Sequence, residues 1–131
     1  MAVSGLIRKD AVWEDVVKYM LLMWGDGTDS GTKAAARVCE AGWMPWVREM
    51  QERGVMLHGG GVLASASSSA MVQVSGPEVL VTDGPFAETK EQIGGYQLIE
   101  CANLDEAIHA ASRHPLARSG VIVEVRPIVP L

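Results

Sequence analysis

The sequence predicts an α+β protein built on a split βαβ plan, with an antiparallel sheet that carries helices on one face. Three observations lead to this class. Segments with strand and helix patterns follow one another in the order strand, helix, strand, hairpin, strand, helix, strand. Both predicted helices have one apolar stripe to bury. With 131 residues, 48% hydrophobic and 21% charged, the chain has the size and composition of one globular domain.

The first part of the chain predicts a strand and then a long helix. Residues 1–16 lack clear periodicity and are expected to be an N-terminal extension. Residues 18–24 are a nearly continuous apolar run, typical of a strand covered on both faces. In residues 32–53 apolar side chains recur every three or four positions, which predicts a helix. Because Pro45 lacks a backbone donor, we expect a kink or two abutting helices there, with Gly54 as the C-terminal cap.

The second part predicts five further strands and one helix. The strands are expected at residues 55–63, 71–74, 79–81, 95–100 and 121–126, the second and third forming a hairpin. Asn103 is followed by Glu106 at capping-box spacing, so a helix is expected to begin there. Its predicted apolar stripe consists of Leu104, Ala107, Ile108 and Ala111. This order is that of a ferredoxin-like fold with an inserted β-hairpin.

The predicted architecture leaves one apolar sheet face uncovered. Because a second copy of the chain is the natural cover for such a face, we expect a homodimer. The net charge of −5 and the lack of a basic cluster beyond Arg8 and Lys9 argue against nucleic acid and anionic membranes as partners. Cys39 and Cys101 are isolated and are expected to be free buried thiols rather than a disulfide. Without a signal-like or membrane-spanning run, the protein is expected to be cytoplasmic.

Asp83 and His58 are the candidate catalytic residues. Asp83 precedes Gly84 and Pro85, which make a stiff corner. In a partly apolar cavity, desolvation would raise the pKa of its carboxyl and make it a usable base, whereas the alternative is that it accepts N–H groups of its own turn. His58 precedes three glycines and could exchange protons with a ligand. The alternative for His58 is an exposed histidine at a strand edge.

Six further side chains are candidate ligand-binding residues: Trp43, Trp46, Phe86, Glu88, Lys90 and Arg126. The tryptophans could wall a pocket for an aromatic ligand, or belong to the core or a dimer interface. The charged residues could grip a small anionic ligand, or form a network that holds a loop.

The glycines at 59–61 are not a phosphate-binding loop, since no Lys-Ser/Thr follows them, and no spacing indicates a metal site. No cofactor is therefore expected.

Residues 82–96 closely resemble the signature of the DGPF-type branch of the YCII-related proteins. The resemblance extends over roughly residues 17–128 and the expected single domain is 17–131. The matching pieces are residues 18–22, 83–91, 94–96, 104–107 and 124–127. The resemblance implies the dimeric α/β-barrel form of the ferredoxin-like fold. It also implies a cavity between sheet and helices near the Asp-Gly-Pro-Phe turn.

Relatives in the broader YCII group use a His–Asp pair for acid–base chemistry, and its Asp matches Asp83. The His of that pair is expected about eleven residues before Gly54, where Trp43 stands. The resemblance implies a small-molecule-binding domain, with three interpretations. The first is an acid–base enzyme in which Asp83 abstracts a proton or promotes elimination on a small organic acid or phenol. The second is a non-catalytic sensor or interaction module linked to transcription regulation, and the third is a purely architectural signature.

Overall fold

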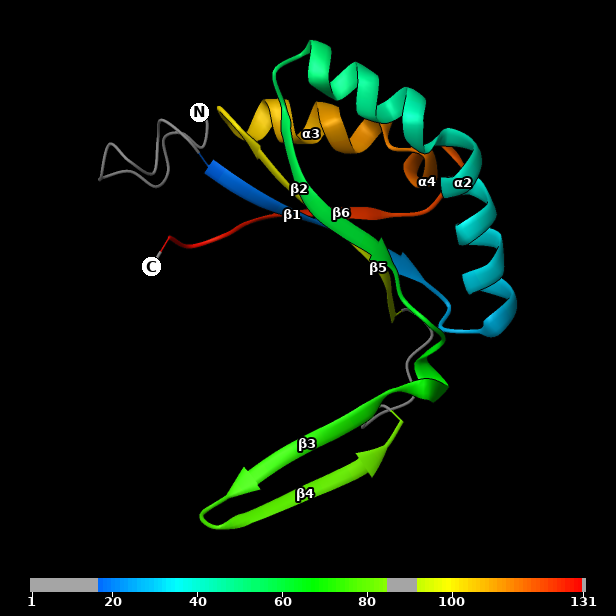
Figure 1. Cartoon of the computed structure of the whole chain (residues 1–131), viewed down its shortest axis with the longest axis vertical. Helices are drawn as coiled ribbons and strands as arrows, with labels where there is room; N and C mark the ends of the chain where they lie inside the picture. The colour runs from blue at the N-terminus through cyan, green and yellow to red at the C-terminus, as the bar shows by residue number, and fades with distance from the viewer. Residues whose placement is uncertain (1–16, 85–91, 131) are drawn as a thin grey trace.

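A computed structural model describes residues 17–84 and 92–130. A four-stranded antiparallel sheet has the order β2-β5-β1-β6, and its helices lie on one face (Figure 1). The strands are β1 (Val17–Gly25), β2 (Met56–Val62), β5 (Gln92–Cys101) and β6 (Val123–Pro127). The helices are α2 (Asp29–Glu52), α3 (Leu104–Arg113) and α4 (Pro115–Arg118). This order confirms the α+β class and the ferredoxin-like plan.

The core lies between the helices and one face of the sheet. Along β1 every second residue from Val17 to Met23 is buried, while Met20 and Leu22 on the other face are half-buried. The buried set also includes Ile99 and Cys101 of β5, Trp46 and Met50 of α2, and Ala107, Ala110 and Ala111 of α3. The prediction that β1 is covered on both faces is therefore wrong for the described part of the chain, residues 17–84 and 92–130, because none of its helices packs on the second face (Figure 1).

Helix α2 is continuous through Pro45, so the alternative of two abutting helices is wrong. The helix bends along its length in Figure 1, as a proline inside a helix favours. It begins at Thr28, whose Oγ1 accepts a hydrogen bond from the Gly31 N–H at 3.0 Å. It ends at Arg53, and Gly54 follows with a φ of +78°, the left-handed conformation expected after a helix end.

Helix α3 begins where the sequence predicts. Asn103 Oδ1 accepts from the Glu106 N–H at 2.9 Å, and Glu106 Oε1 accepts from the Ala102 N–H at 3.3 Å. The predicted stripe is displaced, however, because Ile108 is 49% exposed and Ala110 is buried in its place. Alanines at the centre of the contact let α3 approach the sheet closely, so the larger isoleucine lies at the side.

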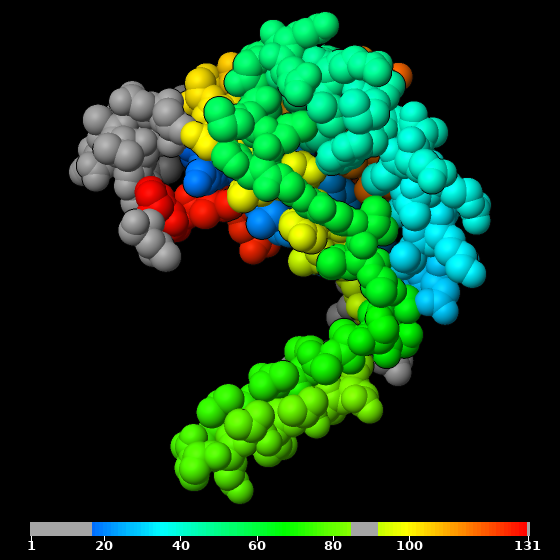
Figure 2. All heavy atoms as spheres, in the orientation of Figure 1, coloured from blue at the N-terminus to red at the C-terminus, as the bar shows by residue number. Residues whose placement is uncertain are grey.

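The predicted hairpin is present as a separate two-stranded sheet, β3 (Ala70–Ser75) and β4 (Glu78–Asp83), preceded by the short 3₁₀ helix η1 (Ala66–Ser68). It projects away from the rest of the protein (Figures 1 and 2). On one of its faces the register pairs valines with valines, and these four are between 62% and 65% exposed: Val72, Val74, Val79 and Val81. An isolated hairpin is marginal in water, so this face needs a cover.

The sheet face without helices is also apolar at its centre. Met20, Leu22 and Trp24 of β1 point to this side, next to Tyr96 of β5, which is 39% exposed. The Trp24 Nε1 donates to Glu124 Oε1 at 3.1 Å across the sheet.

Within residues 17–84 and 92–130, no helix is long and apolar enough to cross a membrane.

Candidate functional site

Two adjoining cavities lie between α2 and the helix-facing side of the sheet. The first has a volume of about 420 Å³ and the second about 390 Å³. Met23 of β1 and Leu116 of α4 line both. Cavities of this size, with mainly apolar walls, are typical of small-molecule sites.

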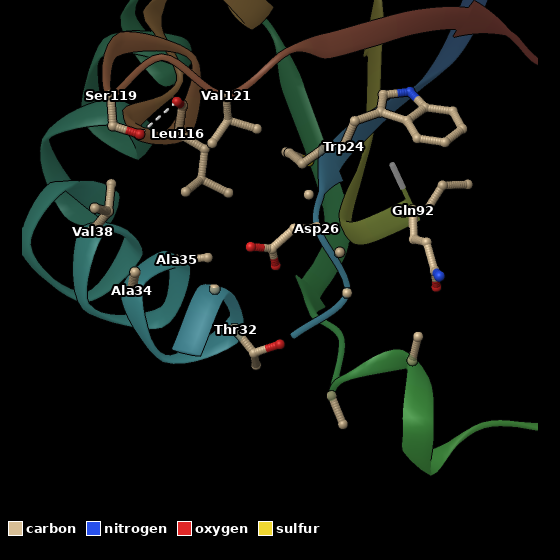
Figure 3. A pocket seen from close by; sticks show the side chains of 18 residues that line it. Trp24, Asp26, Thr32, Ala34, Ala35, Val38, Gln92, Leu116, Ser119 and Val121 are labelled. Carbon is tan, nitrogen blue, oxygen red and sulfur yellow. Dashed lines mark hydrogen bonds between the residues drawn. The ribbon is translucent and has the colours of Figure 1, made fainter. Parts of the chain in front are cut away.

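The first cavity lies beneath the N-terminal half of α2 (Figure 3). Ala34, Ala35 and Val38 border it from α2, and Leu116 and Val121 border it from the opposite wall. The space exists because alanines and glycines stand where larger side chains would fill it. Asp26, Thr32, Gln92 and Ser119 supply the polar side-chain atoms near its rim.

Asp26 is the charged residue at this cavity, and its carboxylate is engaged by the helix entry. Its Oδ1 accepts from the Thr28 N–H at 2.9 Å and from the Thr28 hydroxyl at 2.7 Å. These hydrogen bonds lower the pKa of the Asp26 carboxyl. A side chain on Gly31 would collide with the same carboxylate. Asp26 is therefore an ionised structural group that orders the start of α2.

The second cavity lies further along α2, over β2 and β5. Cys39, Trp43 and Met44 border it from the helix. Gly60, Gly61 and Val62 border it from β2, and Gly95 and Tyr96 border it from β5. A Cβ on Gly60 would collide with the Tyr96 carbonyl, so β2 lies too close to β5 there for any side chain. Burial raises the pKa of the Cys39 thiol, so Cys39 is an apolar wall residue at neutral pH.

His114 is the polar group at the second cavity that the sequence-based candidates missed. His114 is only 1% exposed and caps α4. Its Nδ1 accepts from the Leu116 N–H at 3.1 Å. Burial lowers the pKa of the imidazole to about 4, so the ring is neutral at pH 7. A His directly before a proline that opens a helix was the available signal.

The two candidate tryptophans have different surroundings. Their ring centroids are 5.4 Å apart, and both rings lie edge-on to His114, at 6.1 Å for Trp43 and 4.8 Å for Trp46. Trp46 is 2% exposed and donates its Nε1 hydrogen to the Ala110 carbonyl at 3.0 Å. Trp43 lines the second cavity. Trp43 is thus a wall residue, and Trp46 supports it from the core.

The two candidate catalytic residues do not lie together within one chain. Asp83 ends the exposed strand β4 opposite Ala70, in the projecting hairpin. His58 lies at a bulge in β2, and its Nε2 is 2.7 Å from Glu100 Oε1. Neither residue lines the two cavities.

Arg126, a charged ligand-binding candidate, does not line the two cavities. It donates through Nε to Glu124 Oε2 at 2.7 Å along the same strand face of β6. The bond lowers the pKa of the Glu124 carboxyl. Phe86, Glu88 and Lys90 lie outside the described residues.

The chemistry of the cavity walls is apolar with few charges. Asp26 and Glu40 are the ionisable carboxylic acids that line them, and no lysine or arginine of residues 17–84 and 92–130 does. In the same part of the chain no group of three His, Cys, Asp or Glu side chains could hold a metal ion. The arrangement suits the binding of an organic molecule by packing and a single hydrogen bond.

Comparison with known proteins gives two matches. The sequence profile of the YCII-related domain matches residues 17–131. A curated protein of Rhizobium meliloti (strain 1021), named as uncharacterised, is 44% identical over 70 residues, which make up 50% of this chain and 54% of that protein. The chain thus spans about half the length of the curated relative that it matches.

Proposed function

This chain belongs to the YCII-related family, and from that premise we propose that it binds a small, mainly apolar or aromatic molecule between α2 and the sheet. The observation that supports this function is the pair of adjoining cavities of about 420 and 390 Å³ beneath one helix. Their walls offer apolar area from Met23, Val38 and Trp43. Removal of such area from water is worth about 25 cal/mol per Å².

Non-catalytic binding fits the described cavity walls better than acid–base catalysis does. A general base must lie within hydrogen-bond reach of the proton that it removes. Asp26 is occupied by Thr28, and His114 uses Nδ1 to accept from Leu116. The preferred version of the proposal is therefore a ligand sensor or interaction module, in which occupation of the cavity alters the position of α2. In this version the link to transcription regulation would be the response of a partner to the altered position of α2.

The acid–base version remains the second candidate. It assigns proton abstraction or elimination to Asp83, whose stiff turn would have to lie over a bound ligand. Turnover of the ligand by wild type and by Asp83→Asn separates the two versions, because the sensor turns nothing over and keeps its affinity in both proteins. The enzyme would keep binding but lose turnover by a factor of about 100 or more.

We also propose that the domain acts as a homodimer. Within residues 17–84 and 92–130, nothing covers two apolar surfaces of the single chain: the open sheet face around Leu22 and Tyr96, and the valine face of the hairpin. Figure 2 shows a hollow between the hairpin and the rest of the protein. In a two-fold dimer each copy would supply both surfaces, so each hairpin would meet the sheet of the partner.

Cavity filling tests the binding function. N-phenyl-1-naphthylamine, an uncharged fluorescent probe, is expected to bind the wild-type protein with increased emission. Ala35→Leu places extra carbons in the first cavity and is expected to weaken binding at least about tenfold, because the space is lost. Ala41→Leu, on the exposed side of the same helix, is the matched control and should bind as wild type. Equal binding by both variants, or no binding to wild type, would contradict the proposal.

A further inference from the structure

We propose that His114 donates a hydrogen bond from Nε2 to the ligand in the second cavity, and that this ligand is a neutral planar molecule with one hydrogen-bond acceptor. An aromatic ketone, ester or amide belongs to this class. The inference rests on the proposed binding function and adds to it the charge and polar group of the ligand. Three observations support it: the tautomer of His114, its confinement, and the charges around the cavity.

The hydrogen bond at Nδ1 determines the tautomer. Because Nδ1 accepts from the Leu116 N–H at 3.1 Å, it carries no proton. The ring proton of the neutral imidazole must then be on Nε2, which makes Nε2 a donor. Burial favours this neutral form at physiological pH.

The donor is confined and has no partner of its own. His114 is 1% exposed and lines the second cavity. Among the described residues, no acceptor lies within hydrogen-bond distance of Nε2. The edges and faces of Trp43 and Trp46 restrict the ring, with interplanar angles of 73° and 67°. Because no described side chain or main-chain group accepts from Nε2, an acceptor that enters the cavity can take its hydrogen without breaking another hydrogen bond.

The charges around the cavity exclude an anionic ligand. Glu40 is the charged residue that lines it within residues 17–84 and 92–130. A carboxylate ligand would lose its hydration, face a like charge and meet a neutral imidazole. A neutral acceptor loses far less hydration and gains the same hydrogen bond. The flat side chain of Trp43, which lies on the helix side of the cavity, favours a planar body for the ligand.

A structural role for His114 is the competing explanation. The residue caps the four-residue helix α4 and packs between two tryptophans, whether or not a ligand binds. Under that explanation only Nδ1 matters. The substitution His114→Asn separates the two roles, because an asparagine can still accept from the Leu116 N–H but has no group at the position of Nε2.

The experiment compares three probes by titration of the intrinsic tryptophan fluorescence: 2-acetonaphthone, 2-isopropenylnaphthalene and 2-naphthoate. The first two have nearly the same shape, with a carbonyl oxygen in one and a CH₂ group in the other. For wild type we expect 2-acetonaphthone to bind at least as tightly as the hydrocarbon, and 2-naphthoate to bind weakest. In His114→Asn the ratio of ketone to hydrocarbon affinity should fall about fivefold to tenfold, while the hydrocarbon binds as before.

The outcomes distinguish this inference from the proposed function. If the hydrocarbon binds and the ratio is the same in both proteins, Nε2 is not a donor to the ligand, although the cavity still binds. Tightest binding of 2-naphthoate would overturn the neutral class. If none of the three binds, both proposals fall. Circular dichroism checks that His114→Asn is folded; if it is not, preference of wild type for the hydrocarbon over the ketone overturns the inference, and the reverse preference supports it.

Discussion

The indole N–H of Trp46 donates to the main-chain carbonyl of Ala110 at 3.0 Å, inside the core. The N–H of His114, the normal helical partner of that carbonyl, donates to Ala111 instead at 3.1 Å. Trp46 thus satisfies a carbonyl at the C-terminal end of α3 that the helix leaves open. The bond connects α2 to α3 next to the cavity that Trp43 lines.

Trp46→Phe is expected to destabilise the fold by about 1–3 kcal/mol, because it leaves the buried Ala110 carbonyl without a donor. Trp43→Phe is the matched control: it makes the same chemical change one turn away, where the indole makes no hydrogen bond to a described residue. Urea unfolding followed by circular dichroism measures both. Equal losses for the two variants would show that ring size, and not the hydrogen bond, matters.

Gly31→Ala is expected to destabilise by about 1 kcal/mol, the usual cost of a lost helix cap. Alanine normally stabilises a helix relative to glycine, but here its Cβ would strike the carboxylate of Asp26 and break the contacts of that group with Thr28. Gly25→Ala is the control, because its Cβ has no heavy atom within 4 Å. Thermal unfolding of the two variants checks the difference, and a stabilised Gly31→Ala protein would contradict it.

Stability is expected to fall as pH decreases from about 6.5 toward 4 because of His114. The pKa of its imidazole is about 4 in the folded protein and near 6.5 when unfolded, so the unfolded chain binds the extra proton in this window. The stabilisation from the neutral ring is complete above pH 6.5 and decreases below it. His114→Asn should lose less stability than wild type between pH 7.5 and pH 5, measured by urea unfolding. Parallel losses would show that His114 titrates normally.

Val79→Lys is expected to weaken the proposed dimer, because it places a charge on the valine face of the hairpin. Gln73→Lys adds the same charge on the opposite face of the hairpin and should leave the dimer intact. Sedimentation velocity over a range of concentrations measures both. A dimer unaffected by Val79→Lys would mean that the hairpin contributes nothing to assembly, and a monomeric wild type would overturn the homodimer itself.

The order of elements was predictable because it depends on local patterns. The apolar run of β1, the turn at Gly76 with its φ of +59° and the cap at Asn103 all act over a few residues. The errors concern packing. Whether Ile108 is buried, or β1 is covered on one face or two, depends on elements far away in the sequence.

The site was less predictable, because its main feature is an absence of side chains. The sequence pattern favours titratable groups and so predicts Asp83 and His58 as catalytic residues. Neither lines the two cavities, and their roles stay predictions. Trp43, which the sequence predicts as a candidate wall, lines the second cavity. The role of His114 was not predictable from the sequence, because its burial depends on tryptophans about 70 residues earlier in the chain.

Pro45 divides α2 into an anchored part and an adjustable one. The buried residues of α2, Trp46 and Met50, both follow the proline. The part of the helix before the proline covers the two cavities with small side chains such as Ala35. We expect that first part to settle onto bound molecules of different thickness with little loss of packing elsewhere. Evolution can therefore change which molecule is held by altering a few positions near the front of the helix, while the remainder of the fold stays as it is.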